Sequence, residues 1–152
     1  MQTFLPYPSF VDSAACLDRQ RLGKQRVECK QLLQALGVQV GGVLPPKPSS
    51  WRNHPAAKMW AGYEYSLSLY GVAVCSEWRG RGYQDSLLPQ FVEAGLLCQD
   101  TGAPPWLGDD DFHATHRSNL LHKLPSHYSQ FGWSEPDDLE YVWPIGTALA
   151  LQ

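Results

Sequence analysis

Several features that mark specialised classes of protein are missing from this sequence. No apolar run approaches the ~20 residues of a membrane-spanning helix. The first residues, MQTFLPYPSF, have no basic stretch followed by an apolar core, so we expect neither a membrane association nor a signal peptide. No segment alternates polar and apolar residues in the manner of a strand, and no repeats are present. These absences favour a cytoplasmic, helical protein.

Common motifs of phosphate, acyl-transfer and metal chemistry are missing as well. The sequence contains no glycine-rich phosphate loop, no nucleophile elbow and no H-E-x-x-H zinc motif. No two cysteines form a C-x-x-C pair, and their wide spacing predicts buried thiols in a reducing compartment: Cys16, Cys29, Cys75 and Cys98. We therefore expect no metal and no cofactor.

The composition that is present is globular, with charge distributed unevenly. Of the 152 residues, 43% are hydrophobic and 18% charged, which favours one domain over residues 1–152 with a core of its own. The net charge of -3 argues against a uniformly basic surface. Positive charge nevertheless gathers between Arg19 and Lys30, whereas acidic residues gather at 109–111 and 135–140. A local basic surface remains compatible with nucleic-acid binding.

Capping residues and hydrophobic periodicity predict an all-α fold, a single compact domain of a few packed helices with long irregular connections. We expect the first helix to run from an N-cap at Asp12 or Ser13 to Leu36. His54 and Pro55 are expected to open a second helix that ends near Gly80. Further helices are expected at 89–97 and from a Thr115 cap to Lys123, whereas irregular structure is expected at 41–50, at 101–111 and in the tail with Tyr141 and Trp143.

The first predicted helix concentrates charge on particular faces. At ~100° per residue, Arg21, Lys24 and Glu28 fall on one face, beside an apolar stripe that includes Leu22 and Leu32. The other side of that stripe carries Arg19, Arg26 and Lys30. One interpretation is an ordinary solvated helix with a Lys24–Glu28 pair. The other is a phosphate-binding surface around one catalytic carboxylate.

Two further clusters allow a functional interpretation. Trp51, Arg52 and His54 precede the second helix, where an aromatic ring and a cation could hold a base and a phosphate; alternatively, Trp51 fills the core. The donor-rich run 116–119 would suit an anion at a helix start, or would serve only as caps and surface polarity. The i,i+3 spacing of His113 and His116, close to 109–111, permits a metal site as the weakest hypothesis.

Three blocks of sequence, taken in order, resemble the phage-type pyrimidine-dimer DNA glycosylases, also called endonuclease V. Residues 17–36 (LDRQRLGKQRVECKQLLQAL) are similar to that family's basic first helix with its catalytic glutamate. Residues 53–83 are similar to its second helix, which begins with a histidine and ends in an Arg-Gly-aromatic run. Residues 116–132 (HRSNLLHKLPSHYSQFG) are similar to its basic helix with a following aromatic-glycine ending.

The resemblance implies an all-α fold, an N-terminal amine that attacks the sugar of a damaged nucleotide, and cleavage through an imine at the resulting abasic site. Known members expose a threonine amine after removal of methionine. This chain begins Met1-Gln2, and a bulky second residue retains methionine, so the catalytic pair is expected to be Met1 and Glu28. Together with the residues singled out above, the resemblance gives an expected DNA-binding set of Arg19, Arg21, Lys24, Arg26, Arg52, His54, His116, Arg117 and Lys123.

The sequence therefore predicts a monomeric DNA-repair glycosylase with AP-lyase activity on double-stranded DNA containing pyrimidine dimers or other modified pyrimidines. Two alternatives stay open beside it. One is an enzyme of the same fold that processes a nucleotide or modified base, and the other is a non-catalytic nucleic-acid-binding module. A metal-dependent hydrolase using His113 and His116 is the remaining hypothesis.

Overall fold

The computed structural model describes residues 2–42, 50–99 and 102–144. Within these residues the protein is all-α, as expected, with no strand. The helices are α1 (Phe10–Cys16), α2 (Arg19–Ala35), α3 (Pro55–Trp60), α4 (Glu64–Gly80), α5 (Leu88–Leu97), α6 (Asp110–Lys123) and α7 (Pro125–Tyr128), with short 3-10 turns at Ser50–Asn53 and Ser129–Phe131. Most of the predicted proline-rich loop lies outside the described residues. No described helix has the length and apolar character required to cross a membrane.

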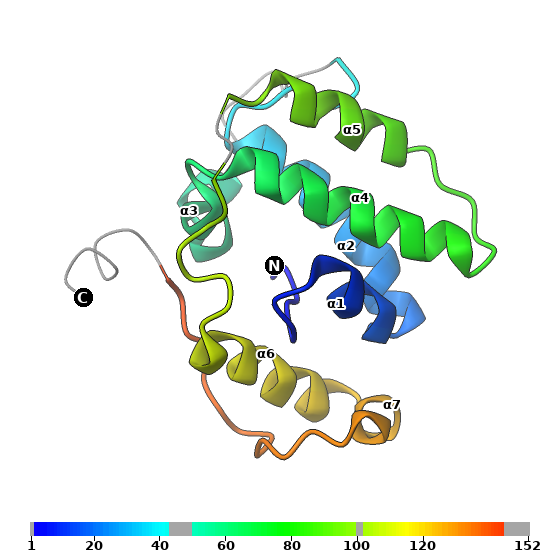
Figure 1. The fold of residues 1–152 in the computed structure, drawn as a ribbon, viewed down its shortest axis with the longest axis vertical. Coiled ribbons are helices and arrows are strands. Elements are labelled where there is room, and N and C mark those ends of the chain that lie inside the picture. Colours follow the sequence, from blue (N-terminus) through cyan, green and yellow to red (C-terminus); the bar gives the residue numbers. More distant parts are fainter. Residues whose placement is uncertain (1, 43–49, 100–101, 145–152) are drawn as a thin grey trace.

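Helix α4 is the centre of the arrangement and packs against α1, α2 and α5 (Figure 1). The N-terminal segment, drawn in blue, lies between α4 and α6 (Figure 1). Beyond α7 the chain returns along α6 in an irregular tail, where Tyr141 and Trp143 pack against the core as expected. The N-terminal segment is therefore surrounded by helices that are distant from it in sequence.

The prediction of one helix from 12 to 36 is wrong, because the chain forms two helices there. Ser9 caps α1, which ends at Cys16. Leu17 and Asp18 are extended, and the Asp18 carboxylate accepts a hydrogen bond from the Arg21 backbone N–H as the N-cap of α2. A strong capping residue thus starts a new helix inside an otherwise continuous helical pattern.

Two other helix boundaries also differ from the prediction. The second helix divides into α3 and α4 at Gly62, whose φ of 88° lies in the left-handed region that favours glycine. Asp109, rather than Thr115, caps the helix that ends at Lys123. The Thr115 hydroxyl instead donates to the Phe112 carbonyl in the preceding turn. The 89–97 prediction is confirmed by α5 to within one residue.

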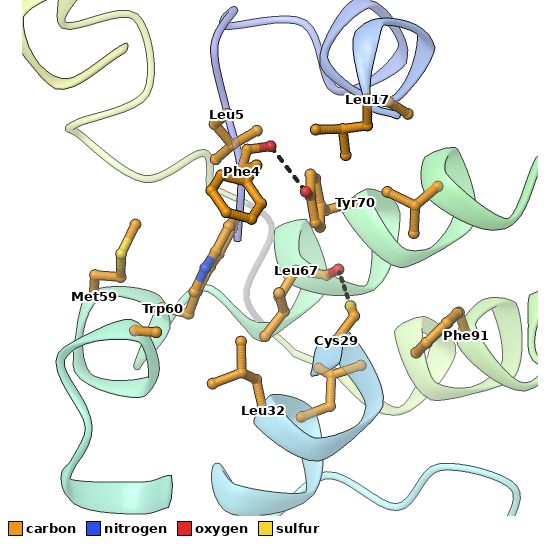
Figure 2. Packing of buried hydrophobic residues seen from close by; sticks show 14 of the residues in the cluster. Phe4, Leu5, Leu17, Cys29, Leu32, Met59, Trp60, Leu67, Tyr70 and Phe91 are labelled. Atoms are coloured by element: carbon orange, nitrogen blue, oxygen red, sulfur yellow. Dashed lines mark hydrogen bonds between the residues drawn. The ribbon is translucent and has the colours of Figure 1, made fainter. Parts of the chain in front are cut away.

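The core lies where α2, α3, α4 and the N-terminal segment meet (Figure 2). Trp60 of α3 and Leu67 and Tyr70 of α4 are fully buried there. Burying such side chains stabilises the fold by roughly 1.5–3 kcal/mol each. Cys16, Cys29 and Cys75 are buried as expected, whereas Cys98 is only partly buried.

Candidate active site

Residues 2–5 run through the interior as an extended segment. Gln2, Thr3, Phe4 and Leu5 are all buried. A buried extended chain that is not part of a sheet must find other partners for its backbone N–H and C=O groups. Side chains from several helices supply these partners, and the Trp60 indole N–H also donates to the Thr3 hydroxyl at 3.0 Å. The segment is therefore fixed in place rather than simply packed.

Gln25 of α2 is the main partner of this segment. Its Oε1 accepts from the Phe4 N–H at 2.9 Å, and its Nε2 donates to the Gln2 carbonyl at 2.7 Å. The Tyr70 hydroxyl donates to the Phe4 carbonyl at 2.8 Å (Figure 2). Gln25 was not among the residues predicted from the sequence, although a polar residue on the apolar face of a helix is a signal of buried hydrogen bonding.

Two histidines of α6 hold the next residue, Leu5. The Leu5 N–H donates to His116 Nδ1 at 2.9 Å. The Leu5 carbonyl lies 2.7 Å from His113 Nδ1, while His113 Nε2 accepts from the Gly108 N–H. These partners assign the N–H to Nδ1 in His113 and to Nε2 in His116. Burial lowers the pKa of both rings, that of His116 to about 3, so both are neutral.

The metal interpretation of His113 and His116 is therefore wrong. Their Nδ1 atoms bind Leu5. In the described part of the chain, no group of three or more His, Cys, Asp or Glu side chains could hold a metal ion. The prediction that His116 contacts DNA is also wrong, because its side chain is 0% exposed and cannot reach DNA.

Glu28 lies at the start of this anchored segment. The Gln2 backbone N–H donates to Glu28 Oε2 at 3.3 Å. Among the described residues Glu28 makes no ion pair, so the ordinary Lys24–Glu28 pair is not formed. Met1, the expected nucleophile, lies outside the described residues. The backbone of its neighbour Gln2 nevertheless touches the predicted catalytic carboxylate.

A pocket of about 290 Å³ opens beside Glu28. Three cations from two helices line it together with the carboxylate, namely Arg21 and Lys24 of α2 and Lys123 at the end of α6. Arg21 also pairs with Asp18 at 3.2 Å. The structure thus brings together four of the predicted site residues, and positive charge predominates around one carboxylate.

A second and wider groove, of about 930 Å³, lies on the other side of Lys24 and Glu28. Trp78 and Tyr83 form its aromatic wall, with ring centroids 4.4 Å apart. The guanidinium of Arg26 lies 5.1 Å from the Trp78 ring, and that of Arg19 lies 6.0 Å from the Tyr83 ring. Such stacked cations and rings suit the bases and phosphates of nucleic acid.

Arg26 is not simply a surface cation in this groove. It forms an ion pair with Asp85, whose side chain is 0% exposed and which also binds Arg79 at 3.2 Å. Burial acts to raise the pKa of Asp85, but hydrogen bonds from the Leu88 N–H and from Arg26 outweigh it and keep this pKa below its usual value. Arg26 therefore lines the groove and also links α2 to Asp85, which lies between α4 and α5.

The other predicted contacts lie outside both cavities. His54 opens α3 as expected, with its Nδ1 accepting from the Ala56 N–H, and Arg52 is exposed just before it. Arg117 is already bound to Glu135 at 2.9 Å and Asp110 at 3.1 Å. The predicted anion site at 116–119 is wrong in its premise, because these residues lie well inside α6 rather than at its start.

The sequence model of a protein family described as pyrimidine dimer DNA glycosylase matches residues 1–89. The chain belongs to this family. The match includes the N-terminal segment, Gln25, Glu28 and every residue that lines the wider groove. It does not include Lys123 or the tail. Neither the curated proteins nor the solved structures contain a significant match. The cationic pocket beside Glu28 and the N-terminal segment is therefore the candidate active site.

Proposed function

We propose that the protein is a DNA glycosylase with AP-lyase activity, acting on double-stranded DNA that contains pyrimidine dimers or another modified pyrimidine. The observation that carries this proposal is the contact between the Gln2 backbone N–H and Glu28, at the edge of a pocket lined by three cations. Side chains of several helices hold residues 2–5, with Gln2 beside this carboxylate, and this anchoring supports chemistry by the N-terminal amine.

The N-terminal amine of Met1 is the proposed nucleophile. An α-amine has a pKa near ~8, against ~10.4 for lysine, so a useful fraction is unprotonated at neutral pH. Its nitrogen bonds to the sugar C1′ while the bond from C1′ to the base breaks, and the base leaves with the electron pair. Opening of the sugar gives a protonated imine. Loss of a C2′ proton then expels the 3′ phosphate and cuts the strand.

Glu28 has two proposed tasks in this reaction. Its carboxylate stabilises the positive charge that develops on the sugar as the base leaves. It also moves protons between the amine, the opening sugar and solvent. Arg21, Lys24 and Lys123 bind the phosphates that flank the reacting nucleotide, because the pocket presents them around the carboxylate.

Replacing Glu28→Gln tests this assignment. We expect the variant to lose strand cleavage at dimers and abasic sites by at least about 100-fold, the usual size of an acid-base contribution, and to bind duplex DNA almost normally. Glu93→Gln on the exposed face of α5 is the matched control and should behave as wild type. A chelator should change neither protein. Full cleavage activity in Glu28→Gln would remove the glutamate from the mechanism.

A further inference from the structure

The pocket beside Glu28 contains two polar groups whose hydrogen-bonding capacity is unused. Gln2 Nε2 and the Tyr141 hydroxyl are buried and have no hydrogen-bond partner among the described residues. Both residues line this pocket. A buried polar group without a partner destabilises a protein by about 1–3 kcal/mol, so such groups near a candidate catalytic centre indicate a ligand that supplies the missing partner.

The tail that carries Tyr141 is held against α6 by polar side chains. Ser118 accepts from the Leu139 N–H at 3.0 Å, Asn119 donates to the Leu139 carbonyl at 3.1 Å, and Thr115 accepts from the Val142 N–H at 3.3 Å. These bonds lie on both sides of Tyr141 in the sequence. Its ring also packs edge-on against His116 at 5.4 Å. The hydroxyl is consequently held in a defined place at the pocket.

The two groups are suited to donating hydrogen bonds. Gln2 Oε1 accepts from the Thr3 N–H at 2.9 Å, which leaves the NH₂ end of the amide as the unused one. Burial raises the pKa of Tyr141 to about 12, so its hydroxyl keeps its proton at neutral pH. An amide NH₂ can only donate, whereas a hydroxyl can donate or accept. A ligand rich in carbonyl oxygens matches this pair best.

We infer that Gln2 and Tyr141 determine substrate specificity by donating hydrogen bonds to the carbonyl oxygens of the modified pyrimidine held beside Glu28. The inference rests on the proposed function and adds the chemical class of the base. Thymine-type bases carry two carbonyl groups, whereas cytosine-type bases carry an amino group in place of one. A donor facing an amino group is left unpaired, and a site built this way rejects the wrong base strongly.

Tyr141→Phe tests the inference because it removes only the hydroxyl. We expect excision of a thymine dimer to fall about tenfold, as for the loss of one hydrogen bond made in the transition state. Cleavage at a preformed abasic site should stay unchanged, because no base is present there to be recognised. Tyr63→Phe, a half-buried tyrosine that does not line the pocket, is the control.

The outcomes are separable. Equal losses on dimer and abasic duplexes would assign Tyr141 a structural role, and unchanged excision of the dimer would show that its hydroxyl is not used; either result overturns the inference. If wild-type protein cleaves neither duplex, the proposed function fails independently. Equilibrium binding then decides the inference, with Tyr141→Phe expected to weaken binding to dimer-containing duplex about tenfold and to leave binding to abasic duplex unchanged. If Tyr141→Phe changed the affinity for the two duplexes by the same factor, the inference would be rejected.

Discussion

Individual side chains determine where the N-terminal segment lies. Residues 2–5 are contacted by four side chains that are distant in the sequence and come close only on folding: Gln25, Tyr70, His113 and His116. The sequence predicted the Arg21, Lys24 and Glu28 face because helical periodicity alone places these residues together. It could not predict the hydrogen bonds to Leu5, because an i,i+3 histidine pair serves a metal site and a backbone clamp equally well. Only the tertiary structure distinguishes the two.

The buried histidine His116 gives a residue-scale prediction about stability and pH. Its pKa is about 3 in the folded protein against 6.5 for a free histidine, mainly because of burial. Below pH ~6.5 the unfolded state therefore binds more protons at this ring than the folded state does. The contribution of neutral His116 to the free energy of unfolding is fully present above that pH. Stability should fall as pH decreases toward ~3, by at most about 1.4 kcal/mol per pH unit for this one group.

The variant His116→Asn removes this titration but keeps an acceptor for the Leu5 N–H. Its free energy of unfolding, measured by urea denaturation between pH 6.5 and 4.5, should depend on pH less steeply than that of wild type. Its absolute stability is expected to be lower at every pH, because a smaller side chain leaves a cavity. His122→Asn, at an exposed position of the same helix, should leave the slope unchanged. Identical slopes in His116→Asn and wild type would contradict the assignment.

At the scale of elements, the positions of the helices were predictable and several of their ends were not. The second predicted helix lies where the sequence placed it, yet the chain breaks at Gly62 because glycine tolerates a left-handed conformation there. Asp18 begins a new helix within a helical pattern. Periodicity identifies the face that packs inward, whereas a break of one or two residues hardly disturbs that pattern.

Close packing of α4 against its neighbours gives the element-scale prediction. A Cβ at Gly71 would lie 2.8 Å from a Phe91 ring carbon and 3.0 Å from the Cys29 sulfur. Gly71→Ala should therefore lower the free energy of unfolding by about 1–3 kcal/mol through overpacking, despite the better helix propensity of alanine. Gly80→Ala at the end of the same helix meets nothing within 4 Å and should be neutral or stabilising. Urea denaturation of both variants is the measurement. A stable Gly71→Ala would contradict the packing.

At the scale of the whole molecule, the fold explains how a chain of net charge -3 can present a basic site. Arg21, Lys24 and Lys123 meet around one pocket, whereas the acidic Asp110 and Glu135 are paired with Arg117 elsewhere. The sequence indicated the basic helix but could not show that Lys123, distant in the chain, joins it. It also gave no indication that Tyr141 lines this pocket, because the position of Tyr141 depends on a tail without regular structure.

The central claim is that the chain terminus provides the nucleophile beside Glu28, and borohydride trapping followed by peptide mapping tests it most directly. Purified protein, with Met1 verified by mass spectrometry, is reduced in the presence of abasic or UV-irradiated duplex and digested with trypsin. Residues 1–19 form one tryptic peptide without lysine, so its only amine is the α-amine. We predict the DNA adduct on this peptide. An adduct on a lysine-containing peptide, or none from protein that binds the duplex, would contradict the account.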